Sequence, residues 1–438
     1  MSVENVINVY RKIFEEVVSK NMFDSLKFRN TLEPIFEREG FRQNMFDPEK
    51  FPNTQFRIMI LQDASIGDFV LLSPCIRELR RIYPAARISL VINSRVYELA
   101  KTCPYVDEII PFDAFADMRN FKKTFEHYID ISKTLLERHF DLAFLFNHFM
   151  TTTLLGYMSG ASDRIITQGQ VNPLNFKIPI ENFVLPLVNA ALPRMSRTNH
   201  YVDKNLKMLD HFLHSPVINR ELEIWYSPQD LSYVRNILRK KGFLGKKIHT
   251  LTLGGTRPDS WYSPEQYSDV FKMIFAKDPD VRLILLGWYK EKFFADVFLK
   301  HLGAEFADRV WNLVAKLELR QTAALLSLVT IHIGNDTGTM HMAAADKIPC
   351  LEVSPYPADQ GLRANTVFLQ FAPYHVPAVV VHPAKSLPEC VGSQESHGCR
   401  SLDKPHCIKT IPPEKVFEGY NLLLDKISRN DRRLSLVH

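Results

Sequence analysis

One segment near the carboxyl end constrains this chain more than any other. Residues 328–333 have the composition of a buried strand, and the turn Gly334-Asn335-Asp336-Thr337-Gly338 leads from them into an alanine-rich helix. The first N–H groups of a helix lack internal partners and carry the positive end of its dipole. Gly338 lets a phosphate approach the backbone, and the hydroxyls of Thr337 and Thr339 add donors. The segment therefore predicts a phosphate or pyrophosphate site.

Apolar runs alternate with helical patterns along most of the chain, and this alternation predicts an α/β protein with parallel sheets. Two doubly wound, Rossmann-like units in tandem would bind ligands at the carboxyl ends of their strands, in a cleft between the units. The predicted domains are a helical N-terminal extension over residues 1–50, an N-terminal unit over 51–215 and a C-terminal unit over 216–438. The predicted strands cover residues 56–61, 88–92, 108–111, 142–146, 248–253, 282–286, 310–313, 329–333 and 348–353.

Two helical predictions can be tested separately. Apolar residues at helical spacing over residues 3–18 indicate that the extension packs on the core or in an oligomer interface, rather than acting in catalysis. In the first unit, Ser73 and Pro74 resemble an N-cap and first helical residue, which predicts a helix from there to Tyr83.

Composition limits the class of protein. The 438 residues are 46% hydrophobic with a formal charge of +5, but no apolar run approaches the roughly 20 residues of a membrane span. The charged N-terminus does not resemble a secretion signal, so a cytoplasmic protein is expected. Nucleic acid is not an expected partner, because the cations are dispersed. A basic stretch is either a solvated helix face or a contact for an anionic glycolipid: Arg235, Arg239, Lys240, Lys241, Lys246 and Lys247.

Asp68 is the candidate base of the first unit. It lies in the turn Asp63-Ala64-Ser65-Ile66-Gly67-Asp68 that follows the first predicted strand, where side chains face a ligand. Its carboxylate would take a proton from an acceptor hydroxyl. The alternative is that Asp68 only caps the following helix. Asp63 is a competitor that would support the loop instead.

Two turns of the second unit carry further candidates. The sequence Gly254-Gly255-Thr256-Arg257 is another glycine-rich turn at a strand end, and Arg257 would pair with a phosphate or form a surface salt bridge. Glu291 follows the strand over residues 282–286. It would accept hydrogen bonds from a ribose or simply be an exposed glutamate at a helix start.

The turn over residues 334–338 and the helix after it contain two residues that each have two possible roles. Asp336 would repel a pyrophosphate, so it is expected either to cap the helix or to meet sugar hydroxyls. His341 lies one turn into the helix and would donate to a phosphate or be a core histidine.

Metal ligation has weak support in the sequence. Asp278-Pro279-Asp280 precedes a predicted strand, at the wrong end of the sheet for a ligand, and is interpreted as a turn. Cys390, Cys399 and Cys407 are spaced as C-x8-C-x7-C without a Cys-x-x-Cys pair, so reduced structural cysteines are favoured over a zinc or iron site. No metal or other cofactor is expected.

Several motifs together resemble glycosyltransferase family 9, the ADP-heptose:lipopolysaccharide heptosyltransferases. They occur in order between residues 57 and 416: Ser65-Ile66-Gly67-Asp68-Phe69-Val70-Leu71, Leu79-Arg80-Arg81-Ile82-Tyr83-Pro84, Pro104-Tyr105-Val106-Asp107-Glu108-Ile109-Ile110, His139-Phe140-Asp141-Leu142 and Gly334-Asn335-Asp336-Thr337-Gly338 with His341. The resemblance implies a GT-B fold and metal-independent, inverting transfer of heptose from a nucleotide donor to a sugar hydroxyl.

The resemblance also implies roles for individual residues. Asp68 matches the family's proposed base, with Ser65 and Gly67 beside it. Asp336, Thr337, Gly338 and His341 match the donor site, and Glu291 matches its ribose-binding acid. The sequence departs from the family near Trp261, where the expected lysine is missing and Arg257 would substitute. Thr339 also replaces the usual proline or leucine-like residue.

The functional prediction is therefore a glycosyltransferase that moves a heptose from ADP-heptose, its substrate, to a lipopolysaccharide core or other glycan acceptor. Peripheral contact with the inner face of the inner membrane would follow from such an acceptor. Two alternatives remain: another GT-B enzyme, such as a nucleotide-sugar epimerase, and a non-catalytic protein that binds nucleotide sugars.

Overall fold

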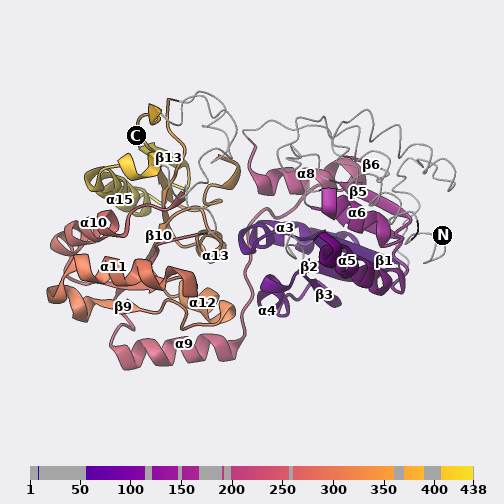
Figure 1. Cartoon of the computed structure of the whole chain (residues 1–438), viewed down its shortest axis with the longest axis horizontal. Helices are drawn as coiled ribbons and strands as arrows, with labels where there is room; N and C mark the ends of the chain where they lie inside the picture. Colours follow the sequence, from indigo (N-terminus) through magenta and orange to yellow (C-terminus); the bar gives the residue numbers. More distant parts are fainter. Residues whose placement is uncertain are drawn as a thin grey trace. The chain divides into compact units, whose positions relative to one another are not determined.

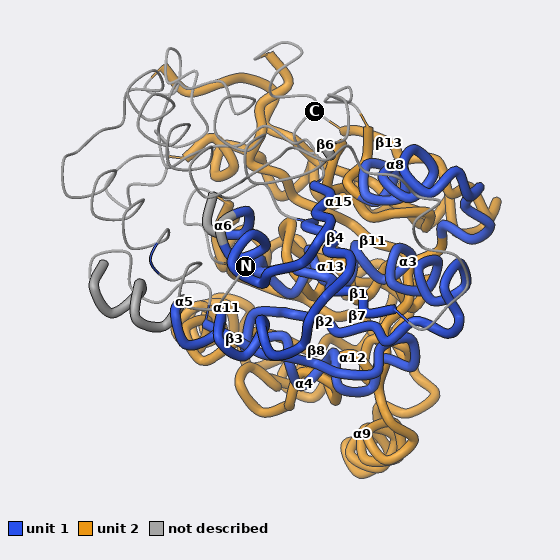
Figure 2. Tube along the Cα trace, turned by 90° about the vertical axis from the view of Figure 1, so that its right-hand side faces the viewer, with its two compact units in different colours: residues 1–196, 202–220 blue, residues 197–201, 221–438 orange. Residues whose placement is uncertain are grey.

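The computed structural model describes residue 8 and residues 56–113, 121–146, 150–166, 190–191, 199–255, 260–359, 369–388 and 406–437. Apart from residue 8, the predicted N-terminal extension lies outside this part. The chain divides into two compact units (Figure 2): residues 1–196 with 202–220, and residues 197–201 with 221–438.

Unit 1 is built on a parallel sheet with the strand order β3-β2-β1-β4-β5-β6 (Figure 1). The strands are rich in branched apolar residues, and the central ones are buried almost throughout, as expected where helices cover both faces of a sheet. Their bounds are Arg57–Gln62 (β1), Arg87–Asn93 (β2), Glu108–Phe112 (β3), Leu142–Leu145 (β4), Asp163–Ile166 (β5) and Ala190–Ala191 (β6).

The helices of unit 1 alternate with these strands. They are Ile66–Ile82 (α3), Tyr97–Ala100 (α4), Phe121–Leu136 (α5), Met150–Met158 (α6) and Tyr201–Leu213 (α8), with a short 3-10 helix at Ser94–Val96 (η2).

The predicted start of the first helix is wrong. Helix α3 begins at Ile66, directly after the β1 turn, and Pro74 lies inside it. A proline there cannot donate to the carbonyl four residues earlier, which is that of Val70. The Ser73 hydroxyl donates to this carbonyl at 2.7 Å instead. Ser73 therefore satisfies the carbonyl that Pro74 leaves free inside the helix, and the Ser-Pro pair does not begin a helix.

Unit 2 has a second parallel sheet, in the order β13-β12-β11-β10-β7-β8-β9. Strands β12 and β13 were not predicted, and the predicted closing helix is followed by β13. The bounds are Lys247–Thr252 (β7), Val281–Leu286 (β8), Val310–Asn312 (β9), Ile331–Gly334 (β10), Cys350–Val353 (β11), Ala378–Val381 (β12) and Leu434–Val437 (β13).

The helices of unit 2 cover both faces of its sheet. Residues of α10, α11 and α15 join one core cluster with one side of the strands, while α12 packs against α9 and α13. The bounds are Pro228–Lys241 (α9), Pro264–Lys277 (α10), Lys292–Leu302 (α11), Leu319–Leu326 (α12), Gly338–Ala345 (α13) and Pro413–Ser428 (α15), with 3-10 helices Tyr289–Glu291 (η5), Ala304–Arg309 (η6) and Cys407–Thr410 (η8).

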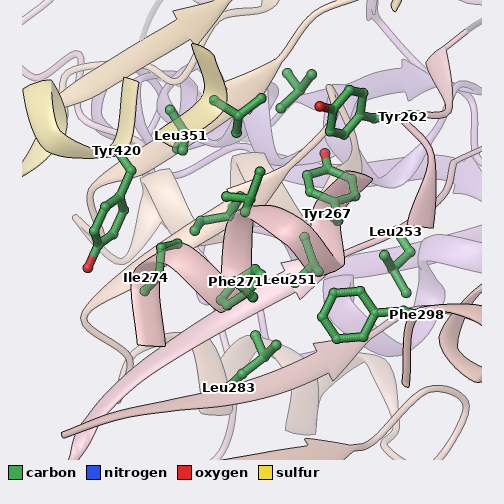
Figure 3. Packing of buried hydrophobic residues seen from close by; sticks show 14 of the residues in the cluster. Leu251, Leu253, Tyr262, Tyr267, Phe271, Ile274, Leu283, Phe298, Leu351 and Tyr420 are labelled. Carbon is green, nitrogen blue, oxygen red and sulfur yellow. The ribbon is translucent and has the colours of Figure 1, made fainter. Parts of the chain in front are cut away.

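Large aromatic side chains fill the core of unit 2 between the sheet and α10, α11 and α15 (Figure 3). Tyr262 and Tyr267 meet edge to face at 4.8 Å between ring centroids, and Phe271 meets Phe298 in the same way at 6.0 Å. The buried Tyr262 hydroxyl donates to the carbonyl of Ile411 at 2.8 Å, which ties the segment before α15 to this core.

Both sheets follow the doubly wound strand order. In each unit the first strands are added on one side of the first strand, and the later strands are added on its other side. The change of side lies between β1 and β4 in unit 1 and between β7 and β10 in unit 2. Loops diverge at such a point and leave room for a ligand at the carboxyl ends of the strands. The predicted turns at residues 63–68, 254–257 and 334–338 all follow one of these strands. Within the described residues, no helix is long and apolar enough to cross a membrane.

Candidate functional site

The turn after β1 places Asp68 at the N-terminus of α3. One carboxylate oxygen of Asp68 accepts hydrogen bonds from the Ser65 backbone N–H at 3.0 Å and from the Ser65 hydroxyl at 2.6 Å. The capping role considered for Asp68 is therefore present in the structure, and the base role stays a prediction. The cap orients a carboxylate that is only partly buried, next to the buried Gly67.

Asp63 lies deeper in the same turn and has a supporting role. Its side chain is buried and accepts a hydrogen bond from the Thr152 hydroxyl of α6 at 2.7 Å. The preceding Gln62 accepts from the backbone N–H of Ala64 at 3.0 Å. These contacts hold the loop from inside, which leaves Asp68 as the better exposed of the two acids.

In unit 2, glycines bring three strand ends close together. A Cβ on Gly254, after β7, would lie 2.5 Å from Cγ of Glu291, and one on Gly255 would lie 3.3 Å from Cγ2 of Thr337. A Cβ on Gly334, at the end of β10, would lie 3.1 Å from the carbonyl oxygen of Thr252. The glycines thus let Glu291 and Thr337 pack directly on the β7 turn. Thr256 and Arg257, the other residues predicted for this turn, lie outside the described residues.

Glu291 is a buried acid at the carboxyl end of β8. Its carboxylate accepts a hydrogen bond from the Trp288 backbone N–H at 2.5 Å, at a helix start as in the alternative, but it is buried rather than exposed. Burial raises the pKa of Glu291, and the backbone hydrogen bonds and Lys290 only partly oppose this shift. A carboxylate that is largely shielded from water is suited to accept hydrogen bonds from a ligand's hydroxyls. The ribose role itself stays a prediction.

The turn after β10 ends at Thr337, which is the N-cap of α13. Among the described residues, no side chain caps this helix, so its first N–H groups remain for a ligand. Asp336 is not the cap. It is exposed, and its carboxylate lies 3.2 Å from Nε2 of His341. His341 is buried, and within the described residues its Nδ1 has no hydrogen-bond partner.

Three threonine hydroxyls form a chain beside this helix start. The Oγ1 atoms of Thr252 and Thr339 lie 2.8 Å apart, and those of Thr339 and Thr337 also lie 2.8 Å apart. The chain connects the end of β7 with the N-cap of α13. Thr252 was missed in the sequence, where its only signal was a polar residue directly before the glycine turn. Thr339, a departure from the family pattern, is the link between the other two.

Glu352 is a second residue that the sequence analysis missed. It lies in β11 beside Gly334, is buried, and has one carboxylate oxygen without a partner among the described residues. Burial raises its pKa, and the negative charge of Asp336 adds to the shift. Glu352 is therefore easier to protonate than a solvent-exposed glutamate. The signal in the sequence was an acid within the apolar run Cys350–Val353.

The metal candidates are only partly described. Cys390 and Cys399 lie outside the described residues. Cys407 is a buried free thiol whose sulfur accepts from the Leu387 backbone N–H at 3.4 Å. Within the described part of the chain, no group of three or more acidic, histidine or cysteine residues could hold a metal ion. Asp278 accepts from Lys247 at 2.7 Å and lies in a turn, at the opposite end of β8 from Glu291.

Two Rossmann-like units, with an uncapped helix N-terminus and a buried acid at the strand ends of one of them, are compatible with a nucleotide-binding enzyme of the GT-B class. The family model for glycosyltransferase family 9 (heptosyltransferase) matches residues 128–354, more than half of the 438 residues. The chain therefore belongs to glycosyltransferase family 9, and it is a glycosyltransferase.

Individual relatives agree with this assignment. The chain is 21% identical to lipopolysaccharide heptosyltransferase 2 of Escherichia coli K12 over 299 residues, which are 66% of this chain and 80% of the relative. A family 9 glycosyltransferase structure from Veillonella parvula has a TM-score of 0.65 at 16% identity, over 87% of this chain and all of the other. The structure of E. coli ADP-heptose lps heptosyltransferase II has a TM-score of 0.61 at 18% identity, over 85% of this chain and all of that one. These two structures support the GT-B fold.

Proposed function

We propose that the chain transfers a heptose from ADP-heptose to a sugar hydroxyl of a lipopolysaccharide core, with inversion and without a metal ion. The observation that carries this proposal is the donor-type arrangement of unit 2, in which the open N-terminus of α13, the threonine chain and Glu291 meet at the strand ends. The choice of donor and acceptor is supported by the names of relatives: the E. coli and Campylobacter coli relatives are lipopolysaccharide heptosyltransferases, and a similar E. coli structure is that of an ADP-heptose lps heptosyltransferase.

In this proposal unit 2 holds the leaving nucleotide. The first N–H groups of α13 and the Thr337 hydroxyl donate to the diphosphate, and Arg257 adds a positive charge. Donors that are already in position when negative charge develops on the leaving group lower the barrier without further reorganisation. Glu291 accepts from ribose hydroxyls. Asp336, which lies 3.2 Å from His341, serves the transferred sugar rather than the phosphates.

Unit 1 supplies the base. Asp68 takes the proton of the acceptor hydroxyl, whose oxygen then attacks the anomeric carbon from the face opposite the ADP. One displacement inverts the configuration at that carbon, and no second carboxylate is needed to form a covalent intermediate. General-base help of this kind contributes about 10²–10⁴-fold to the rate. The same activity would bring the protein to the cytoplasmic face of the membrane that holds the acceptor.

A thermal-shift panel with ADP, GDP, UDP and their sugars tests the donor. A ligand present at about 100 times its dissociation constant should stabilise the protein by about 2.7 kcal/mol. We expect ADP and ADP-heptose to give the largest shifts. A preference for UDP would overturn the heptose proposal.

A second assay separates the reaction types. The protein is incubated with donor alone and then with donor plus lipid A–core acceptor. A glycosyltransferase releases ADP and extends the glycan only when the acceptor is present. Interconversion of the free donor would show an epimerase, and binding without turnover would show a non-catalytic protein.

A further inference from the structure

Large exposed apolar side chains gather at one place on unit 2. Trp288, Tyr289 and Phe293 lie within six residues, at the junction of η5 and α11, and are 56%, 53% and 69% exposed. The Trp288 and Tyr289 rings contact each other edge to face, with 4.4 Å between their centroids. Clustered aromatics that remain exposed mark a surface that meets another molecule more often than isolated ones do.

At this junction one side chain is buried, and its aromatic neighbours are exposed to solvent. Glu291 is buried against Gly254, whereas the three aromatic residues around it point to solvent. Phe293 rests on Phe294, with 6.2 Å between their ring centroids, and Phe294 meets Trp261 at 4.9 Å. The cluster is therefore held in place by the same turn that carries the acid of the proposed donor site.

The charged residues of the cluster are mainly cationic. Lys290 and Lys292 stand on either side of the buried Glu291 and are exposed. The Lys290 ammonium lies 5.7 Å from the centre of the Trp288 ring. One exposed acid, Asp296, follows a turn later on α11. Tryptophan, tyrosine and lysine together are the side chains that favour the headgroup region of a bilayer.

We propose that Trp288, Tyr289, Lys290, Lys292 and Phe293 form an interfacial patch through which unit 2 rests on an anionic lipid surface. The aromatic rings enter the boundary between headgroups and acyl chains, and the ammonium groups remain among the phosphates. The inference rests on the proposed function in one respect. The patch would bring the donor site to an acceptor that is held in a membrane.

Two other occupants fit the patch less well. A nucleobase would stack on only one of the rings and would not account for three exposed rings beside two exposed lysines. The basic face of α9 is the competing lipid surface, because Lys240 and Lys241 are exposed there. Its exposed apolar side chains are fewer, namely Tyr233 before the cations and Leu244 after them.

Vesicle binding of the full chain tests the proposal. Flotation with phosphatidylcholine vesicles that contain phosphatidylglycerol should recover the wild type, and pure phosphatidylcholine should recover much less. The combined variant Trp288→Ser, Tyr289→Ser, Phe293→Ser should lose most of this binding. The pair Lys290→Gln, Lys292→Gln should weaken it by about 5-fold for each lysine and reduce its salt dependence. The matched control, Lys240→Gln with Lys241→Gln on α9, should bind like the wild type.

Tryptophan fluorescence provides a second measurement that does not depend on a triple variant. Brominated phosphatidylcholine in the anionic vesicles should quench the wild type, and Trp288→Phe should abolish most of that quenching. Equal quenching in both proteins would overturn the proposal, as would loss of binding in the α9 control instead. Weaker ADP binding by the aromatic variant, with unchanged vesicle binding, would assign the patch to the nucleotide. None of the vesicle results requires turnover, so failure of the proposed reaction would be detected separately.

Discussion

Helices α3 and α13 both begin at the carboxyl end of a central strand of a doubly wound sheet, yet they differ in the charged side chains at their ends. Helix α3 carries Asp68 in its first turn and Arg80 and Arg81 in its last, so its own side chains offset its dipole. Helix α13 has no acidic residue in its first turn and no basic residue in its last. The positive end of α13 is therefore left for a ligand.

This difference predicts different chemistry for the two turns. A carboxylate at the start of α3 would repel a diphosphate but can accept a proton. The start of α13 offers backbone N–H groups and hydroxyls, which favour an anion, and the acid beside it, Asp336, lies next to His341. A base in unit 1 and a leaving-group site in unit 2 follow from this contrast, and the following changes test it.

Replacing Asp68 by asparagine should have the largest effect. Asparagine keeps the size of the side chain but cannot take a proton, so kcat/KM should fall by about 10²–10⁴-fold. The affinity for ADP, measured by calorimetry, should stay as in the wild type, since the nucleotide is assigned to unit 2. Near-normal turnover of this variant would remove Asp68 from the mechanism and leave it as a helix cap.

The far end of α13 should affect stability in a pH-dependent way. Burial raises the pKa of Asp346, at the C-cap, to about 7, although the Tyr226 hydroxyl and Lys347 oppose the shift. The folded protein therefore holds a proton that the unfolded chain releases near pH 4. The stabilisation is complete below that pH and is lost as the pH rises to about 7, by on the order of 4 kcal/mol at most.

Asp346→Asn removes this titration and serves as its test. Between pH 5 and about 7, the melting temperature of the wild type should decline relative to that of the variant. Parallel melting curves for the two proteins across this interval would show that Asp346 titrates normally.

Breaking the threonine chain should have a smaller effect on nucleotide binding. If Thr252 donates to Thr339 and Thr339 donates to Thr337, the Thr337 proton is directed to the ligand. Thr339→Val removes the link and should raise the dissociation constant for ADP by about 2- to 10-fold, the effect of one hydrogen bond. Thr339→Ser keeps the hydroxyl and is the matched control. The idea fails if valine and serine bind ADP equally well.

Ser65→Ala should give the smallest change. It removes the hydroxyl that donates to Asp68 but leaves the carboxylate in place. We expect the free energy of unfolding of unit 1 to fall by about 1 kcal/mol, as for other N-cap serines, and ADP affinity to be unaffected. A fall in ADP affinity would instead link Ser65 to the nucleotide.

Much of the fold follows from local patterns. Strand β1 is a nearly continuous apolar run, as expected where helices bury both faces of a parallel sheet. Strand β7 is also buried but contains the polar residues His249, Thr250 and Thr252. Strand β13 was missed because it is the edge strand and only one of its residues is buried. Strand β12 was missed although all four of its residues are apolar and buried, and β5 and β6 of unit 1 were also not predicted. The start of α3 was misplaced because Ser-Pro is a common helix opening, and only the contact with Val70 reveals its other use.

The sequence by itself determined two parallel α/β units, a glycine-bounded anion turn and a base candidate after the first strand, because periodicity and turn chemistry depend on neighbouring residues. Only the tertiary structure decided that Thr252 joins Thr339 and Thr337, that Gly254 makes room for Glu291, and that Glu352 lies buried beside the β10 turn. These residues lie in or after different strands, and no local pattern records which strand ends the folded sheet brings together.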